Sequence, residues 1–295
     1  MKRLVGFLLF LIIIGGGAFY ILKNYYPYLI LPSKNIKLYL PLNDKTFSPI
    51  KIPSSYNLSL FADLKGELPR VLAFDSNGTL FASITSAGRV VALPDYDGNL
   101  KMDERIEVLK GLKKPHGLIF NGQYLYVTES NKVSRYQYDP YSFEVGTKEN
   151  IIEFPDDGGN LPRTLKIKDN KLYISDPFNS QILESNLDGT DLKVFEKVQS
   201  KSSFFTFDET GKIISLDSTL GLTYDGDGNL LVSTDNKILR FVMFAGSVQN
   251  MTNFVTGFIQ GSGEVLGRPT DLIFDKNGKL FISDDKTGLI YVLSK

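Results

Sequence analysis

The 295-residue sequence contains no cysteine, no tryptophan and a single histidine, His116. The absence of cysteine excludes disulfides, thiolate zinc sites, iron–sulfur clusters and cysteine nucleophiles. A single histidine also excludes metal sites and mechanisms that need two imidazoles. The chain lacks a phosphate-binding glycine loop, a dinucleotide-binding glycine pattern and a nucleophile-elbow motif. Serine-hydrolase chemistry would have to use His116, and we do not expect it.

The chain also lacks an excess of either charge, because 33 Lys and Arg residues balance 33 Asp and Glu residues. A broad basic surface for nucleic acid is therefore not expected. Hydrophobic residues make up 42% and charged residues 22% of the chain, which permits a packed core. The 21 Phe, 15 Tyr, 26 Gly and 13 Pro residues are typical of a β-rich chain with many turns.

An uncharged apolar run covers residues 4–22 and follows two basic residues, Lys2 and Arg3. As a helix this run would be about 28 Å long, close to the thickness of a bilayer core. We therefore expect residues 1–28 to be a transmembrane anchor or an uncleaved signal segment, with a cleaved signal peptide as the alternative. Residues 29–55 are predicted to be an extended linker or stalk that carries a domain outside the cytoplasm, at the cell surface or in the periplasm.

Residues 56–295 repeat one pattern, in which a proline, two residues and a leucine precede a short apolar strand, a turn and a second strand. The four clear copies begin at Pro69, Pro115, Pro162 and Pro269. Leu72 and Leu118 are 46 residues apart, and Leu118 and Leu165 are 47 residues apart. A period of this length built from short strands is typical of β-propeller blades. The sequence therefore predicts an all-β propeller domain over residues 56–295.

The repeat contracts in its second half. The segments 205–208 and 222–225 look like first strands but lie only 17 residues apart, too close for two complete blades. We therefore predict six blades with a contracted fourth or fifth blade, and five blades are the alternative.

Several segments of the repeat carry a family resemblance, namely residues 70–75, 114–118, 163–165, 263–269 and 280–285. In their order and spacing, the chain resembles the glucose/sorbosone dehydrogenase family of soluble quinoprotein sugar dehydrogenases over roughly residues 65–295. The resemblance implies a six-bladed propeller that binds pyrroloquinoline quinone (PQQ) and calcium and oxidises a sugar. It also implies a histidine that accepts the substrate's hydroxyl proton.

The chain departs from the family at the position of that base. Asn160 stands there, and an amide cannot accept a proton at neutral pH. His116 and Asp157 are the other candidates for a base, although His116 in a Pro-His-Gly-Leu turn is also explained as a structural residue. The family's Arg-Asn pair falls at Ser200 and Lys201 and is therefore missing.

The positions that would hold the cofactor are partly retained. Lys237 and Arg268 match family residues that hold the carboxylates and quinone oxygens of the cofactor, and Asp285 matches a further position. Independently of the family resemblance, the positions that flank the repeat prolines predict a mostly basic ring at the mouth of the channel. The residues before the prolines or their equivalents are Glu67, Lys113, Lys114, Asn160, Lys201 and Arg268, and those after them are Arg70, His116 and Arg163. Such a ring favours an anion. The predicted cofactor-binding residues are Lys237, Arg268, Asp285, Arg163 and Lys201. The alternative is a solvated rim paired with Asp156, Asp157 and Glu264.

A separate acidic segment suggests a metal site. Asp95, Asp97, Asn99 and Asp103 supply oxygens at positions 1, 3, 5 and 9 of a calcium-type loop. Leu100 stands where such loops have glycine, and the loop has no glutamate at position 12. A plain turn between strands is the alternative, and we favour it.

Two functions follow from these observations. The first is a membrane-anchored, extracytoplasmic sugar dehydrogenase-like propeller of the PQQ type, with an altered active site. The second is a non-catalytic surface propeller that binds a glycan, a small anion or a protein partner. PQQ binding and sugar-dependent turnover would distinguish them.

Overall fold

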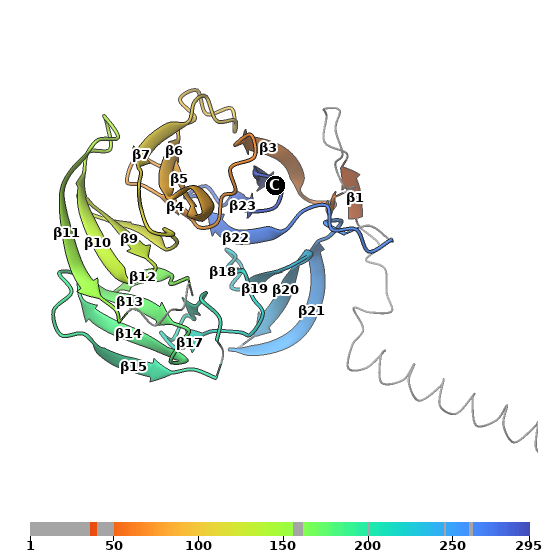
Figure 1. Ribbon diagram of the computed structural model, residues 1–295. Helices are drawn as coiled ribbons and strands as arrows, with labels where there is room; N and C mark the ends of the chain where they lie inside the picture. The colour runs from red at the N-terminus through yellow and green to blue at the C-terminus, as the bar shows by residue number, and fades with distance from the viewer. Residues whose placement is uncertain (1–35, 40–49, 156–161, 200, 245, 260–261) are drawn as a thin grey trace, which may run out of the picture.

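The computed structural model describes residues 36–39, 50–155, 162–199, 201–244, 246–259 and 262–295. These residues form five four-stranded antiparallel sheets arranged as blades around one axis, together with two small two-stranded sheets (Figure 1). The prediction of an all-β propeller is confirmed. None of the helices formed by the described residues is long and apolar enough to cross a membrane, and the predicted anchor at residues 1–28 lies outside them.

We number the four-stranded blades in chain order. The first blade contains β4 (Leu72–Phe74), β5 (Leu80–Ile84), β6 (Arg89–Leu93) and β7 (Ile106–Leu109). The second contains β8 (Leu118–Asn121), β9 (Tyr124–Glu129), β10 (Lys132–Tyr138) and β11 (Val145–Glu153). The third contains β12 (Leu165–Lys168), β13 (Lys171–Asp176), β14 (Gln181–Asn186) and β15 (Lys193–Lys197).

The chain completes two more blades. The fourth contains β18 (Gly221–Tyr224), β19 (Leu230–Thr234), β20 (Lys237–Phe244) and β21 (Ser247–Val255). The fifth contains β22 (Pro269–Phe274), β23 (Leu280–Asp284), β24 (Leu289–Ser294) and β3 (Asn57–Asp63). β3 pairs antiparallel with β24, so the strand nearest the N-terminal side of the domain closes the last blade. This pairing closes the ring without leaving β24 as an open edge.

A short sheet precedes the ring. β1 (Ile36–Tyr39) pairs with β2 (Ile50–Pro53), and Lys51 forms a bridge with Thr256 next to β21. Ile50 and Ile52 are buried in the apolar cluster shared by the fourth and fifth blades. Residues from Ile50 onward therefore belong to the packed domain.

The contracted part of the repeat forms a hairpin of two short strands, β16 (Thr206–Phe207) and β17 (Ile213–Ile214). Only residues 198–220 separate β15 from β18, which is half of one repeat, so a complete blade does not fit there. Six four-stranded blades are thus not confirmed in the described part of the chain. The hairpin is nevertheless packed, because Phe205 and Ile213 are buried against Tyr173 and Ile182 of the third blade.

Buried hydroxyl groups link neighbouring blades at the start of the innermost strands. Thr128 donates a hydrogen bond to the carbonyl of Arg163, and Ser283 donates one to the carbonyl of Arg70. Ser233 bonds the carbonyl of Thr270 in the same way. These residues lie at equivalent positions on the second strands, and each contact crosses from one blade to the next. The hydroxyls fix the backbone of the segments that surround one end of the central channel, because a buried polar group is rarely left unpaired.

Candidate functional site

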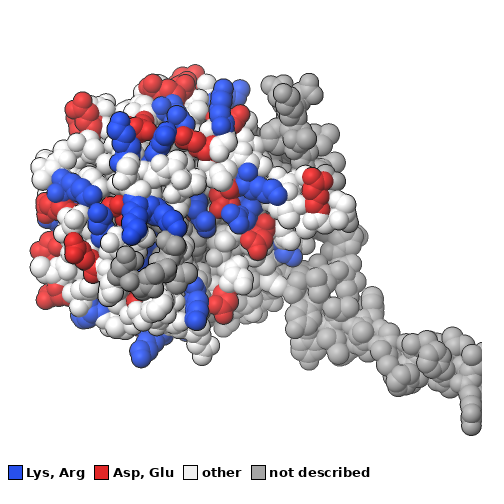
Figure 2. All heavy atoms as spheres, in the orientation of Figure 1, with Lys and Arg blue, Asp and Glu red and all other residues white. Residues whose placement is uncertain are grey.

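The innermost strands β4, β8, β12, β18 and β22 all begin at one end of the channel, which we call the mouth. Neighbouring strands within each blade are antiparallel, so the turns from second to third strands lie at the mouth as well. On the face seen in Figure 2, basic side chains gather toward the middle with acidic side chains among them. Which cations are available to a ligand therefore depends on how they are paired.

Two arginines at the mouth share one buried carboxylate. Arg268 donates through Nε to Oδ1 of Asp285 over 2.5 Å, and Nε of Arg70 lies 3.5 Å from Oδ2 of the same residue. The Asp285 side chain is only 2% exposed, whereas those of Arg70 and Arg268 are 26% and 40% exposed. Asp285 alone cannot neutralise both guanidinium groups, so the three residues of this Arg70–Asp285–Arg268 cluster keep a formal positive charge, and solvent reaches both arginines. The carboxylates of Asp235 and Asp284 also act on Arg268.

The two arginines respond to this environment in opposite ways. The hydrogen bond that Arg268 donates to Asp285 raises the pKa of Arg268. Burial lowers the pKa of Arg70, partly offset by the attraction of Asp285, and the nearby Arg268 lowers it further. A guanidinium stays protonated in proteins at neutral pH, so both residues can still donate to an anion. The structure thus brings Arg268 and Asp285 together with Arg70, which the sequence placed in the basic ring.

Arg163 also lies beside the mouth by its backbone, but its side chain is turned into the protein. The side chain is 3% exposed and donates to the carbonyl of Ser130 over 2.8 Å and to Asp176 over 3.3 Å. Its guanidinium stacks over the ring of Phe154 at 4.2 Å. These contacts brace the second blade against the third, and the guanidinium is not presented to the mouth.

The two predicted lysines lie on different elements. Lys237 begins β20, next to Asp235, whose charge acts on Arg268. Lys237 is half-buried, and the described residues provide no hydrogen bond or ion pair for its ammonium group. The backbone N–H of Lys201 donates to Asp217, and Lys201 is exposed. Lys237 is therefore a cation beside the mouth that a ligand could engage.

His116 is held in the interior just inside the mouth. The residue is 1% exposed, its ring lies 5.3 Å from the ring of Phe204, and neither ring nitrogen has a hydrogen-bond partner among the described residues. Burial, and then the nearby charge of Arg70, lower the pKa of His116 to about 3, although the carbonyl of Arg163 acts weakly in the other direction. The imidazole is neutral at pH 7 but accepts a proton poorly.

Several residues of the predicted site cannot be placed. Asn160, Asp157, Asp156 and Ser200 lie outside the described residues. Pairing of the rim with Asp156 and Asp157 therefore stays a prediction. Within the predicted ring, Glu67 binds two arginines from outside it, Arg89 at 3.1 Å and Arg105 at 2.7 Å.

Sequence reasoning missed Asp176, which fixes Arg163. A repeated signal could have indicated it, because a hydroxyl residue followed by an acid ends three of the second strands: Thr128-Glu129, Ser175-Asp176 and Ser283-Asp284. In each case the acid then bonds the segment before the inner strand, through Lys113, Arg163 or Arg268. The acid of this pair is therefore a structural partner for whichever donor lies in the segment before the inner strand of its own blade.

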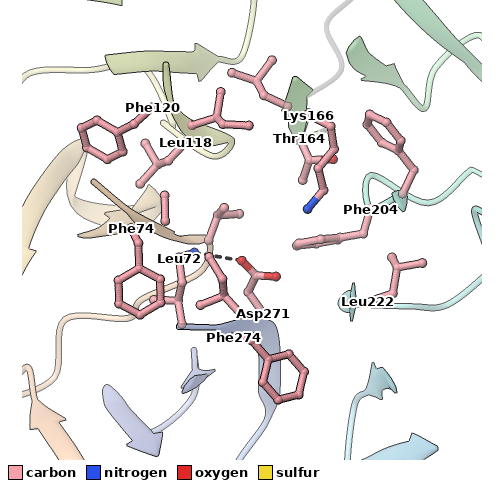
Figure 3. A pocket seen from close by; sticks show the side chains of 16 residues that line it. Leu72, Phe74, Leu118, Phe120, Thr164, Lys166, Phe204, Leu222, Asp271 and Phe274 are labelled. Carbon is pink, nitrogen blue, oxygen red and sulfur yellow. Dashed lines mark hydrogen bonds between the residues drawn. The ribbon is translucent and has the colours of Figure 1, made fainter. Parts of the chain in front are cut away.

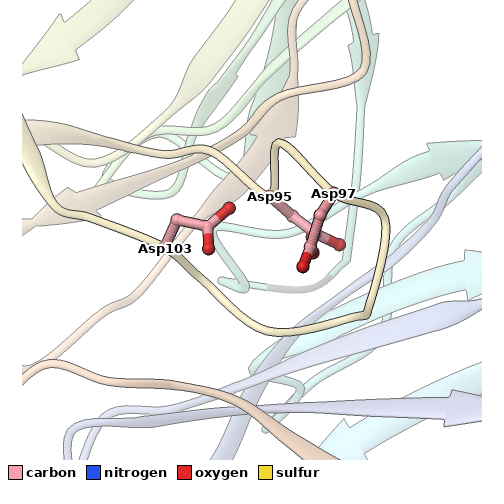
Figure 4. A group of neighbouring side chains, drawn as sticks. All are labelled: Asp95, Asp97 and Asp103. Carbon is pink, nitrogen blue, oxygen red and sulfur yellow. The ribbon is translucent and has the colours of Figure 1, made fainter.

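The predicted calcium loop lies between β6 and β7, at the end of the channel opposite the mouth. Carboxylate oxygens of Asp95, Asp97 and Asp103 all lie within 4.8 Å of one another (Figure 4). Backbone N–H groups of Asn99 and Leu100 already donate to Asp95, and the side-chain amide of Asn99 donates to Asp97. The structure brings the three aspartates together but uses them within the turn.

Further along the channel lies a cavity of about 220 Å³ (Figure 3). Its wall combines the inner strands of four blades with Phe204 and Phe205, which precede the hairpin β16–β17, and Leu222 of β18. Lys166 and Asp271 supply the two charged groups of its lining. Sequence reasoning assigned neither of them a role.

Comparisons with known proteins give one family match and several similar folds. A family model described as TrAA12-like matches residues 50–251. The structure is similar to the holo PQQ domain of a pyranose dehydrogenase from Coprinopsis cinerea, with a TM-score of 0.70 and 12% identity over 88% of this chain and 100% of that one. It is also similar to PQQ-bound aldose sugar dehydrogenase from Streptomyces coelicolor, with a TM-score of 0.59 and 12% identity over 82% of this chain and 99% of that one.

A calcium structure of a Trichoderma reesei protein of Carbohydrate-Active Enzymes family AA12 gives a TM-score of 0.64 and 16% identity over 86% of this chain and 100% of that one. No curated protein sequence matches the chain. At such identities the structural likeness shows the fold alone. Together with the family match, it confirms the predicted resemblance to PQQ-dependent sugar dehydrogenases.

Proposed function

The chain belongs to the TrAA12-like family, and from this we propose that it is a PQQ-type sugar dehydrogenase-like propeller, anchored in a membrane with its domain outside the cytoplasm. The observation that carries the proposal is the Arg70–Asp285–Arg268 cluster at the mouth, in which two solvent-accessible arginines share one buried carboxylate. The anchor rests on the apolar run at residues 4–22 and the basic residues before it.

The described residues fit the chemistry of PQQ, which carries three carboxylates and an ortho-quinone. Arg268 and Arg70 would hold carboxylates through charge-assisted hydrogen bonds, and Lys237 would engage a quinone oxygen or a further carboxylate. We do not assign Arg163 to the cofactor, because Asp176 and Ser130 already engage its guanidinium. When bound, PQQ supplies an acceptor for the hydride taken from the sugar.

We propose that a group other than His116 accepts the sugar's hydroxyl proton. His116 is buried with a pKa of about 3, so it is a weak base at neutral pH. Asn160 cannot accept the proton at all. Asp157 is the nearby carboxylate in sequence and is the first residue to change if turnover occurs.

A second candidate function is ligand binding without turnover. It is favoured by the amide at position 160 and by the low basicity of His116. In that case the mouth would bind a sugar acid, another small anion or the quinone, and no electrons would be transferred.

Two finer features complete the proposal. The hairpin β16–β17 would be the reduced form of a sixth blade, since it lies between the third and fourth blades in sequence and packs on the third. Asp95, Asp97 and Asp103 would hold calcium, because hard cations prefer carboxylate oxygens. This ion would stabilise a loop remote from the mouth and would take no part in oxidation.

The test is a dye-linked assay of the full-length protein after loading with PQQ and calcium. Pyranoses and other aldoses would be added with a redox dye, and dye reduction would be followed. Sugar-dependent reduction that an Arg268→Met variant loses would support the dehydrogenase. Stoichiometric PQQ binding without reduction would support the binding alternative. Absence of PQQ binding by the folded protein would overturn both quinone proposals.

A further inference from the structure

The cavity in the channel contains two opposite charges that the protein does not pair with each other. Lys166 and Asp271 both reach into it, from β12 and β22 (Figure 3). The described residues provide no hydrogen bond or ion pair for the ammonium group of Lys166. The two groups act on each other only through their charges, because the structure has no ion pair between them.

Asp271 is held with its carboxylate open to the cavity. Oδ2 accepts from the backbone N–H of Leu72 over 2.9 Å, and Oδ1 accepts from the backbone N–H of Leu272 over 2.9 Å. Each carboxylate oxygen can accept a further hydrogen bond. Burial raises the pKa of this group to about 6, with these two hydrogen bonds and the charge of Lys166 opposing the rise.

Most of the other side chains of the wall are apolar, and Thr164 is a polar one. Phe74, Phe120, Phe204 and Phe274 line the cavity beside the charged groups. A ligand with a single charge would leave the opposite charge of the wall uncompensated, which is costly inside a protein. The wall therefore fits a molecule with one anionic end, one cationic end and an apolar body.

We propose that this cavity binds a small zwitterion, an α-amino acid with an apolar side chain of about the size of leucine. Its carboxylate would bind Lys166 and its ammonium group would bind Asp271, with the side chain against the phenylalanines. A cavity of about 150 Å³ accommodates benzene, so 220 Å³ is sufficient for such a molecule. None of the three residues of the Arg70–Asp285–Arg268 cluster lines this cavity, and the inference does not depend on the proposed function.

The experiment is calorimetric titration of the full-length protein with L-leucine at pH 7.5. 4-Methylpentanoate and isopentylamine serve as probes that keep the apolar body of leucine and only one of its charges, and glucose serves as the hydroxyl-rich probe. We expect saturable binding of L-leucine, with each single-charge probe at least about tenfold weaker, because each loses one charge-assisted contact. Binding of glucose in place of L-leucine would overturn the proposal.

The variants Lys166→Met and Asp271→Asn should each weaken L-leucine binding at least about tenfold. Lys168→Met is the matched control, because Lys168 lies on the same strand but pairs with Asp169 at 2.7 Å, and it should bind L-leucine as the wild type does. If Asp271→Asn fails to fold, Lys166→Met alone decides the matter. Unchanged binding in Lys166→Met, or no binding by the folded wild type up to about 10 mM L-leucine, a range reaching well past millimolar affinity, would overturn the proposal.

Discussion

Arg163 and Arg268 occupy similar places in the repeat, beside the proline that precedes an innermost strand, yet the structure uses them differently. The side chain of Arg163 is 3% exposed and bonds to Asp176 and the carbonyl of Ser130. That of Arg268 is 40% exposed and shares Asp285 with Arg70. One arginine is a structural brace between blades, and the other is solvent-accessible and shares its carboxylate with a second arginine.

The difference comes from the neighbours of each arginine. Asp176 faces one guanidinium, whereas Asp285 faces two. A basic residue at a channel mouth therefore indicates an anion site only when its side chain is exposed and its acidic partner is shared with a second cation. The predictions below test whether this account of the two arginines is right.

Arg163→Met should have the largest effect on folding. It leaves Asp176 buried without its cation, and breaking a buried ion pair from one side costs about 3–5 kcal/mol. The free energy of unfolding, measured by urea denaturation, should fall by that amount. Arg268→Met is the control and should cost about 1 kcal/mol or less, since its partner keeps Arg70. Equal losses in the two variants would contradict the distinction.

Ser283→Ala should have the next largest effect on the free energy of unfolding. Ser283 donates to the carbonyl of Arg70 and accepts from the backbone N–H of Asp271. The change leaves two buried backbone groups without a partner, at about 1–3 kcal/mol, and it loosens the segment that carries Arg70. Ser142→Ala, in an exposed turn, is the control and should change stability by less than about 0.5 kcal/mol. A negligible effect of Ser283→Ala in urea denaturation would contradict the role of the inter-blade hydroxyls.

His116 and Asp271 should give opposing pH dependences. The folded-state pKa of His116, about 3, lies below its unfolded value of 6.5, so its contribution to stability is complete above pH 6.5 and is lost as the pH falls toward 3. The folded-state pKa of Asp271, about 6, lies above 3.8, so its contribution is complete below pH 3.8 and is lost as the pH rises through 6. The two effects partly cancel between pH 3.8 and 6.

Variants separate these two contributions. His116→Gln should remove much of the loss of stability between pH 6.5 and 4, and Asp271→Asn should steepen that loss. Thermal unfolding at several pH values measures both. A pH profile that His116→Gln leaves unchanged would show that the buried histidine does not shape acid stability.

Added calcium should give the smallest change in the free energy of unfolding. If Asp95, Asp97 and Asp103 hold the ion, 1 mM calcium should stabilise the protein by less than about 1 kcal/mol for a site of millimolar affinity. Asp97→Asn should abolish this gain, whereas Asp227→Asn, in another exposed turn, should keep it. A gain that survives Asp97→Asn would place calcium elsewhere.

The sequence was sufficient for the fold because the repeat is a local pattern. Each proline, leucine and turn acts within one blade, so the spacing of Leu72, Leu118 and Leu165 was enough to predict a propeller. The number of complete blades was harder, because residues 198–220 retain the apolar residues of a blade without its length. Their hairpin is defined by packing on Tyr173 rather than by its own pattern.

The site was predicted less completely because its chemistry depends on pairing between blades. Arg268 and Asp285 were both predicted and lie together, but Arg70 enters their cluster from another blade. The burial of Arg163 depends on Asp176, and the low pKa of His116 depends on Phe204 and Arg70 in other parts of the ring. Sequence position alone gives no such contacts.

The most direct test of the account is the affinity for PQQ, measured from the quinone absorbance in full-length wild type, Arg268→Met and Arg163→Met. The account predicts that Arg268→Met weakens binding by about 10- to 100-fold, because it loses a charge-assisted hydrogen bond to the ligand. Folded Arg163→Met should bind PQQ with an affinity within about twofold of the wild type, because the Arg163 guanidinium does not reach the mouth. A twofold change corresponds to less than about 0.5 kcal/mol of binding free energy. The reverse order of the two variants' affinities, or no PQQ binding by the wild type, would contradict the account.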